Sequence, residues 1–248
     1  MAIIDQTIDR EIGKKLLELN QIERENHKSS GKFSASMLGN PLQWNILKMI
    51  GVPAKELDEY TLRKFKRGKD IEEWLVSHLK DVVAKQEFVE YRGWIGYADA
   101  IVDTKDYEFK FGITPREIKS VTNMAFKYIV QEGEAKPAHK LQGGFYGLGK
   151  SATHFGVDYV ASDDLRVQTF VYPVADVKPD IDRIIDENEA SLHSGQVPVF
   201  EPREKWQGDK LYNNFPDWAG LTQEEIGDKL KSEYPEAYQK LILLKETK

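Results

Sequence analysis

The sequence contains no cysteine among its 248 residues. This absence excludes disulfides, thiolate zinc sites, iron–sulfur clusters and cysteine nucleophiles. No stretch approaches the roughly 18 consecutive apolar residues that a membrane span needs. The start of the chain also lacks the apolar run of a signal peptide. We therefore expect a cytoplasmic protein that does not have a membrane partner.

The sequence also lacks an excess of positive charge. It has 35 Lys and Arg residues against 41 Asp and Glu residues, and its formal net charge is −6. This balance argues against a generally basic coat for nucleic acid, although an acidic protein can still carry a local basic groove. With 40% hydrophobic residues, the chain is long enough to bury a sizeable core.

The spacing of apolar residues predicts most of the secondary structure. Helical spacing predicts helices over residues 4–27, within 32–52, and over 58–85, 122–134, 136–150, 179–194 and 222–246. We expect the apolar face of the first helix to be packed. Ser34 or Ser36 can cap the second helix. Strands are predicted at about 87–92, 95–103, 106–111, 115–121, 154–161 and 166–172. An aromatic loop is expected over 197–220, with Trp206, Tyr212, Phe215 and Trp218.

Charged residues stand inside two of these predicted strands. Asp99 lies on one strand, and Glu117 and Lys119 lie on a later one. Because successive side chains of a strand point to opposite faces, Glu117 and Lys119 share a face while Ile118 points into the core. Buried carboxylates without a partner are costly, whereas a hard divalent cation such as Mg²⁺ or Mn²⁺ neutralises them. The pattern therefore predicts a metal site that cuts phosphodiester bonds.

The pattern Gly96-x-x-Asp99, followed by Glu117-x-Lys119, resembles the PD-(D/E)XK nuclease superfamily, in particular its RecB-like and phage lambda-type exonuclease branch. Ala98 occupies the position where the family often has proline. The resemblance implies an α/β fold with a mixed central β-sheet flanked by helices, the restriction-endonuclease-like core. It also implies metal-dependent hydrolysis of DNA.

The family likeness implies a single nuclease domain over residues 1–248. Within it, a helical segment would cover about 1–85 and a helical extension about 176–248. The strand-then-helix order of the family favours Glu117 over the rival triplet at Glu108 and Lys110, because Glu108 is followed by a turn. Asp103 competes with Asp99, since residues four apart in a strand face the same way, but Asp103 adjoins a predicted turn.

Two further motifs extend the resemblance. Gly68-x-x-x-Glu72 is similar to the first motif of lambda-type exonucleases and implies that Glu72 is a third metal ligand. Because Glu73 stands beside Glu72, the alternative is that the two are simply adjacent acids on the solvated face of a helix. Gln142-x-x-x-Tyr146 is similar to the fourth motif of RecB-like nucleases, which contacts DNA near the site; packing is the alternative for this pair.

Ser34-x-Ser36, followed by Asn40-Pro41, resembles the entry segment of RecB-like nucleases. Asn40 stands where these nucleases often have a cluster-binding cysteine, which implies a variant without an iron–sulfur cluster. The densest basic run of the chain is able to contact phosphates. A plain solvated helix face is an equally good interpretation of this run. It consists of Arg63, Lys64, Lys66, Arg67 and Lys69.

The resemblance implies a role for each of these residues. Glu72, Asp99, Glu117 and the backbone carbonyl of Ile118 would hold one or two Mg²⁺ or Mn²⁺ ions. Lys119 would position the attacking hydroxide and offset negative charge on the phosphate. The residues expected to contact DNA are Gln142, Tyr146, Ser34, Ser36, Arg67 and Lys69.

We therefore expect a DNA nuclease, an exonuclease rather than an endonuclease, that acts in recombination, repair or phage DNA processing. Its partners would be DNA ends and a recombination or replication protein, and the protein itself could form oligomers. The host would be a bacterial or phage-infected cell. One alternative is a P-loop nucleotide hydrolase, because Gly144–Ser151 (GFYGLGKS) matches that pattern formally. The other is a catalytically inactive DNA-end-binding protein of the same fold.

Overall fold

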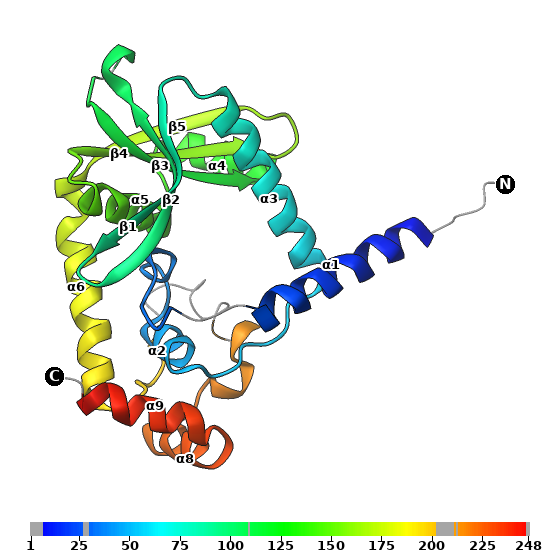
Figure 1. Ribbon diagram of the computed structural model, residues 1–248, viewed down its shortest axis with the longest axis vertical. Helices are drawn as coiled ribbons and strands as arrows, with labels where there is room; N and C mark the ends of the chain where they lie inside the picture. Colours follow the sequence, from blue (N-terminus) through cyan, green and yellow to red (C-terminus); the bar gives the residue numbers. More distant parts are fainter. Residues whose placement is uncertain (1–6, 27–29, 109, 202–210, 212, 247–248) are drawn as a thin grey trace.

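A mixed sheet lies at the centre of the computed structural model, which describes residues 7–26, 30–108, 110–201, 211 and 213–246 (Figure 1). Five strands follow one another in the order β1-β2-β3-β4-β5. Strands β3 and β4 are parallel, and the other neighbouring pairs are antiparallel. The strands are β1 (Val82–Tyr91), β2 (Trp94–Asp103), β3 (Ile113–Val121), β4 (His154–Ala161) and β5 (Val167–Pro173).

Helices flank the sheet on both faces. Helix α3 (Glu59–His78) packs on β2 and β3, and α5 (Pro137–Gly149) packs across the opposite face. The crossover between the parallel strands consists of α4 (Asn123–Glu132) and α5. The predicted α/β fold with a mixed central sheet flanked by helices is therefore confirmed.

A second helical layer lies away from the sheet. Helix α6 (Val174–Ser194) runs beside α5 and reaches α2 (Leu42–Ile50) and α9 (Pro235–Glu246), with α8 (Gln223–Glu233) packed against α9 (Figure 1). The described residues also form three short 3₁₀ helices: η1 (Ala35–Met37), η2 (Thr104–Asp106) and η3 (Pro216–Trp218). No helix in the described part of the chain is long and apolar enough to cross a membrane.

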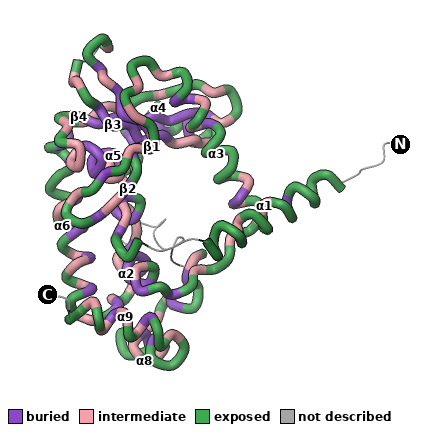
Figure 2. The backbone as a smooth tube through the Cα atoms, in the orientation of Figure 1, coloured by how far each residue is buried: buried purple, intermediate pink, exposed green. Residues whose placement is uncertain are grey.

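Buried residues gather along the sheet and the helices beside it (Figure 2). Two hydrophobic clusters of the described residues hold the sheet between its helices. The smaller cluster joins Ile71 and Leu75 of α3 to Ile118 of β3. The larger one includes Phe145 of α5 and Tyr159 of β4, and it continues into the second helical layer. Ile118 thus points into a core, as the alternation of the strand predicts.

Capping side chains define the helix starts near the site. Asp58 precedes α3 and accepts a hydrogen bond from the Thr61 backbone N–H at 2.7 Å. Thr122 caps α4 in the same way, through the Ala125 N–H. Ser34 precedes η1, whereas α2 begins after Pro41; the prediction that either serine caps α2 is therefore wrong.

Several predicted boundaries are also wrong. Residues 106–111 contain no strand in their described part, because the Thr104 hydroxyl donates to the Gly112 carbonyl at 2.9 Å and closes a turn. The helix predicted over 58–85 ends at His78, and Val82 already belongs to β1. The helix predicted over 222–246 is two helices divided before Pro235, because proline cannot continue a helix. Trp206 and Tyr212 lie outside the described residues.

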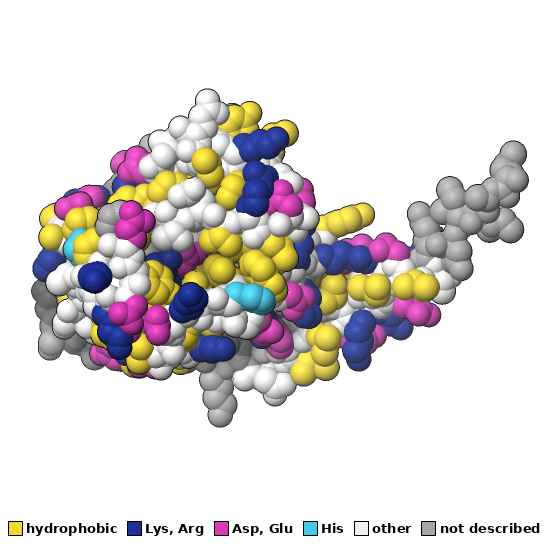
Figure 3. Space-filling model, turned by 90° about the horizontal axis from the view of Figure 1, so that it is seen from above, with side chains coloured by type: hydrophobic (Ala, Val, Ile, Leu, Met, Phe, Trp, Pro, Cys, Tyr) yellow, Lys and Arg dark blue, Asp and Glu magenta, His cyan; other side chains and the backbone are white. Residues whose placement is uncertain are grey.

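The first helix, α1 (Thr7–Asn26), projects from the body of the molecule (Figure 1). It crosses α3 at Gly13, where an added Cβ would lie 1.9 Å from a Glu59 carboxylate oxygen. Hydrophobic side chains are exposed along this projecting arm (Figure 3). They include Ile8, Ile12, Leu19 and Ile22. The prediction that this apolar face is packed is therefore wrong for the described chain.

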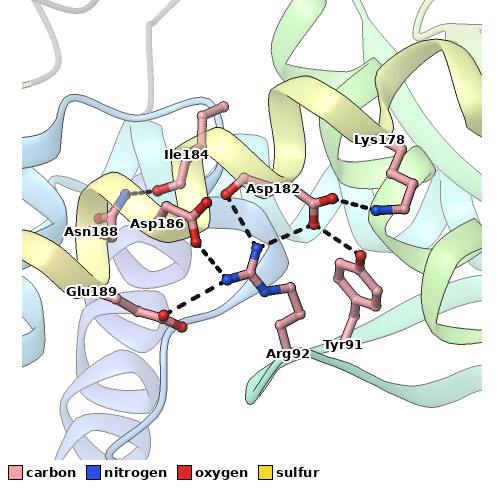
Figure 4. Close-up of polar contacts among 8 residues, drawn as sticks. All are labelled: Tyr91, Arg92, Lys178, Asp182, Ile184, Asp186, Asn188 and Glu189. Atoms are coloured by element: carbon pink, nitrogen blue, oxygen red, sulfur yellow. Dashed lines mark hydrogen bonds and ion pairs between the residues drawn. The ribbon is translucent and has the colours of Figure 1, made fainter.

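The β1–β2 hairpin is fixed to α6 at its tip. Arg92 and Gly93 both have positive φ, 49° and 79°, as a two-residue hairpin turn requires. The Arg92 guanidinium forms ion pairs with Asp182, Asp186 and Glu189 of α6 (Figure 4). This contact holds the hairpin at one orientation to the second helical layer.

A buried ion pair joins β3 to β4. The side chains of Arg116 and Asp158 are 6% and 1% exposed, and the Arg116 Nε donates to the Asp158 carboxylate at 2.8 Å. The Thr169 hydroxyl donates to the same carboxylate. Arg116 immediately precedes Glu117, so this pair anchors the strand that carries the predicted acid.

Replacing Asp158 with alanine should destabilise the fold by about 3–5 kcal/mol, because it leaves the Arg116 charge buried without a partner. The free energy of unfolding in urea measures the effect. The matched control is Asp164→Ala, which removes an exposed ion pair with Arg166 and should cost at most about 1 kcal/mol. Equal losses in the two variants would contradict the prediction.

Candidate active site

The predicted acids lie where β2 and β3 separate. The ladder between these strands ends at the pair Ala100 and Arg116, and the next residue on each strand is Asp99 or Glu117. The Ile118 backbone N–H, which β2 no longer pairs, donates to the Asp99 carboxylate at 2.7 Å. The fork therefore places one acid on each strand at the same level.

Strand β2 changes face at Asp99. Ala98 belongs to the larger cluster on the α5 side, whereas Ala100 belongs to the cluster on the α3 side. In a regular strand two residues so spaced would share a face, so the backbone is twisted between them. On the neighbouring strand, Gln86 has a φ of 46°. The twist turns the Asp99 carboxylate into the fork.

Glu117 is completely buried beneath α5. A Cβ added to Gly143 of α5 would lie 3.6 Å from the Glu117 Cβ and 2.7 Å from the Phe155 ring, so glycine allows the helix to approach this closely. Glu117 forms an ion pair with Lys119, whose side chain is 30% exposed. Neither oxygen of the Glu117 carboxylate accepts a hydrogen bond of normal geometry. Lys119 and Tyr146 lie close enough to the carboxylate to lower the pKa of Glu117, against the larger effect of burial.

Burial and mutual repulsion raise the pKa values of the two acids. Burial, with further contributions from Glu117 and Glu72, raises the pKa of Asp99 to about 8. The pKa of Glu117 is also raised by burial, which outweighs the opposing effect of Lys119. Burial disfavours the charged form of Lys119, but Glu117 and Asp99 more than offset this and raise its pKa. The fork thus contains more carboxylates than its one ammonium neutralises.

Glu72 of α3 lies near this fork, but its side chain is engaged elsewhere. Its carboxylate accepts a hydrogen bond from Gln86 of β1, and burial raises its pKa. Within the residues that the structure describes, no group of three or more His, Cys, Asp or Glu side chains is arranged to hold a metal ion. The donor chemistry of Asp99 and Glu117 fits a hard cation. Ligation of a metal by Asp99, Glu117, Glu72 or the Ile118 carbonyl stays a prediction.

The predicted DNA-contacting pair on α5 borders the fork. The Gln142 amide donates to the Tyr146 hydroxyl at 2.9 Å. Burial, followed by the charge of Glu117, raises the pKa of Tyr146, so this phenol stays protonated. A Cβ added to Gly96 of β2 would lie 2.8 Å from the Tyr146 ring. The Tyr146 ring therefore packs against Gly96 of β2, and its hydroxyl lies near Glu117.

The predicted entry segment meets β2 at the same glycine. Ser34 forms a β-bridge with Ile95, and a Cβ added to Gly96 would lie 2.8 Å from the Ala35 Cβ. The hydroxyl oxygens of Ser34 and Ser36 are 3.0 Å apart, and Ser36 is exposed. The structure thus brings both serines to the strand that carries Asp99, while their contact with DNA stays a prediction.

The basic run lies on α3 and is partly neutralised. Arg63 forms an ion pair with Asp9 of α1, and Lys66 forms one with Asp70. Arg67 and Lys69 are exposed. Lys69 is close enough to lower the pKa of Glu72 by its charge, against the larger effect of burial. Lys69 is therefore the member of the run that the structure connects to the fork.

The rival residues lie away from the fork. Glu108 and Lys110 are exposed beyond η2. Asp103 accepts a hydrogen bond from the Lys105 backbone N–H at 3.1 Å and caps η2, as a turn residue does. The P-loop alternative is wrong, because Gly144–Gly149 is helical and the helix ends there, whereas a phosphate-binding loop precedes its helix.

Two residues that shape the fork were not found from the sequence. Gln86 engages Glu72, and Gly143 admits α5 above Glu117. Gly143 left a weak signal, since glycine is unfavourable within a helix and its presence there suggests close packing. Gln86 left none, because its role depends on the pairing of β1 with β2 and on the position of α3.

Comparisons with known proteins concern the fold. Neither a protein-family model nor a curated protein matches the chain. The alkaline exonuclease LHK-Exo from Laribacter hongkongensis superposes with a TM-score of 0.47 and 15% identity, over 65% of this chain and 89% of that one. The protein SSO0001 gives 0.46 and 18%, over 83% and 94%. A phage-related exonuclease from Haemophilus somnus 129PT gives 0.43 and 12%, over 67% and 94%. At these scores, the site is interpreted from its own geometry.

The raised pKa of Asp99 predicts that the metal-free protein loses stability as the pH rises. Its value of about 8 lies above the ~3.9 of an exposed aspartate. Between these values the folded chain binds more protons than the unfolded chain, so the free energy of unfolding falls with increasing pH. Urea unfolding in EDTA at about pH 5 and about pH 8 measures this fall. Asp99→Asn should reduce it and Asp103→Asn should not; equal pH dependence in both variants would refute the assignment.

Proposed function

We propose that the protein is a metal-dependent nuclease that hydrolyses phosphodiester bonds in DNA. The observation that carries the proposal is the fork itself. The fully buried Glu117 and the half-buried Asp99 converge from adjacent strands, and one ammonium in direct contact with Glu117 leaves their charge incompletely neutralised. A hard divalent cation would neutralise the remainder. The same cation would bind a phosphate oxygen at this position.

In this proposal Asp99 and Glu117 hold Mg²⁺ or Mn²⁺, with Glu72 and the Ile118 carbonyl as further candidate ligands. A bound metal of this kind supplies two effects: it lowers the pKa of a water molecule and stabilises negative charge on the phosphate. Glu117 is suited to its role because its two oxygens are buried without hydrogen bonds of normal geometry. Asp99 is oriented by the Ile118 N–H.

Lys119 is the residue that can act on the phosphate itself. Its ammonium contacts the buried Glu117 carboxylate, and its side chain remains 30% exposed, so Lys119 lies between the acids and the surface. Its pKa is raised by the neighbouring carboxylates after burial is offset, and it therefore stays charged at neutral pH. A fixed positive charge at this point would stabilise the charge that develops as the phosphate is attacked.

The surroundings of the fork suit a nucleic-acid chain. Arg67 and Lys69 expose their side chains on α3, where cations can contact backbone phosphates without regard to sequence. Tyr146 and Gln142 border the acids from the opposite helix. We further propose action at DNA ends, in recombination, repair or phage DNA processing, because the family resemblance of the motifs implies an exonuclease.

Lys119→Ala should reduce cleavage by about 10²–10³-fold, the usual effect of removing one charge-stabilising group, with little loss of DNA binding. The assay uses end-labelled linear DNA and circular DNA, each with Mg²⁺, Mn²⁺ or EDTA. Lys110→Ala, which changes an exposed lysine outside the fork, is the control and should retain activity. Degradation of linear DNA alone supports an exonuclease. Cleavage that survives both EDTA and Lys119→Ala would refute the proposal, and metal-independent DNA binding without cleavage would indicate an inactive DNA-binding protein.

Asp99→Asn should weaken Mn²⁺ binding by at least about 10-fold, since even outer groups of metal sites contribute this much. Isothermal titration calorimetry of the metal-free protein with Mn²⁺ measures the affinity without reference to activity. Glu108→Gln, which removes an exposed carboxylate of the rival triplet, should leave the affinity unchanged. If Glu108→Gln weakens binding and Asp99→Asn does not, the site has been assigned to the wrong acids.

A further inference from the structure

Two exposed aromatic side chains face each other across the β1–β2 hairpin. Phe88 and Tyr97 are direct partners in the ladder, and they are 45% and 55% exposed. Their ring centroids are 5.6 Å apart, with an interplanar angle of 65°. In such an edge-to-face pair, one ring covers at most one face of the other. The pair therefore keeps aromatic surface in contact with solvent.

The strands turn these rings away from the core. The next residue on each strand, Val89 and Ala98, is 1% and 0% exposed, so the alternation of the backbone points Phe88 and Tyr97 outward. Exposed apolar side chains that adjoin one another form a patch, and such patches mark binding sites more often than single exposed residues do. The pair thus differs from the aromatic residues that build the core.

The pair is close to the acid fork. Tyr97 precedes Asp99 by two residues on β2, which corresponds to about 7 Å along a strand. On β1, Gln86 precedes Phe88 by two residues and hydrogen bonds with Glu72 of α3. The aromatic pair therefore lies two residues along the strand from Asp99 on β2 and from Gln86 on β1.

The hairpin holds the rings in a fixed position. Arg92 at its tip binds three carboxylates of α6, and Tyr91 donates a hydrogen bond to Asp182 at 2.9 Å. A surface fixed at both the tip and the fork does not need to be ordered when a ligand binds, which lowers the entropic cost of binding.

We propose that Phe88 and Tyr97 stack against an unpaired base of the DNA strand next to the phosphate that is cut. Aromatic side chains stack on bases of any sequence. The bases of a duplex are already stacked within the helix, and exposing one costs a few kcal/mol. The substrate is therefore single-stranded or frayed at the site. This inference rests on the proposed nuclease function, because the acid fork supplies the reason for DNA to lie here.

The test measures binding of a 12-nucleotide single strand that carries 2-aminopurine, whose fluorescence falls when the base stacks, and of a 12-base-pair duplex. All proteins carry Lys119→Ala so that the DNA stays intact. Phe88→Ile and Tyr97→Ile keep apolar, strand-forming side chains but remove the ring. Each should weaken single-strand binding by about 10-fold and abolish part of the quenching, with a smaller effect on the duplex. Tyr97→Phe should retain both signals.

Val83→Ala is the matched control, because Val83 is another exposed apolar residue of β1, at 61% exposure, and should not change binding. Unchanged single-strand affinity and quenching in both isoleucine variants would overturn the inference and leave a hairpin-stabilising or protein-docking pair. So would equal losses in Tyr97→Phe and Tyr97→Ile. The two proposals can fail separately. If the protein cleaves DNA but the isoleucine variants bind and quench normally, only the stacking inference is refuted. If the isoleucine variants lose affinity and quenching but the protein never cleaves DNA, only the proposed nuclease function is refuted.

Discussion

The rest of this structure depends on one constraint: negative charge is buried away from water at the fork between β2 and β3. Asp99 and Glu117 occupy positions where hydrophobic residues would pack at no electrostatic cost. Burying the two acids costs electrostatic free energy. One lysine and one backbone N–H reduce this cost but do not remove it, because both acids keep raised pKa values. The fold retains an unfavourable arrangement that a proton relieves and that a bound cation, as proposed, would also relieve.

The surrounding elements maintain this arrangement from three directions. Helix α3 brings Glu72 and the exposed basic residues to one side of the sheet. Helix α5 covers Glu117 on the other side, and its approach depends on the absence of a side chain at Gly143. The buried pair of Arg116 and Asp158 fixes β3 to β4 one residue before Glu117. A carboxylate held so firmly cannot move away from its neighbour to reduce their repulsion.

The sequence alone predicted the strands that carry the acids, because β-branched residues surround Asp99 and Glu117 and alternation determines the shared face of Glu117 and Lys119. It did not predict the twist at Asp99, which arises where the β2–β3 ladder ends. The aromatic segment at 106–111 has the composition of a strand, but hydrogen bonds of Thr104 close it as a turn. The amphipathic pattern of α1 correctly indicated a helix, yet such a pattern does not specify a partner, and its apolar face is exposed. Tertiary pairing, rather than local preference, decided each of these cases.

Helix α5 carries four glycines, Gly143, Gly144, Gly147 and Gly149, within its 13 residues. Glycine disfavours a helix by about 1 kcal/mol relative to alanine, so this segment does not form a stable helix in isolation and becomes helical only against the completed sheet and α6. The cover over Glu117 therefore depends on packing of α5 against the sheet and α6. A nascent or partly unfolded chain has no assembled acid fork, and any chemistry of the fork is confined to the finished molecule.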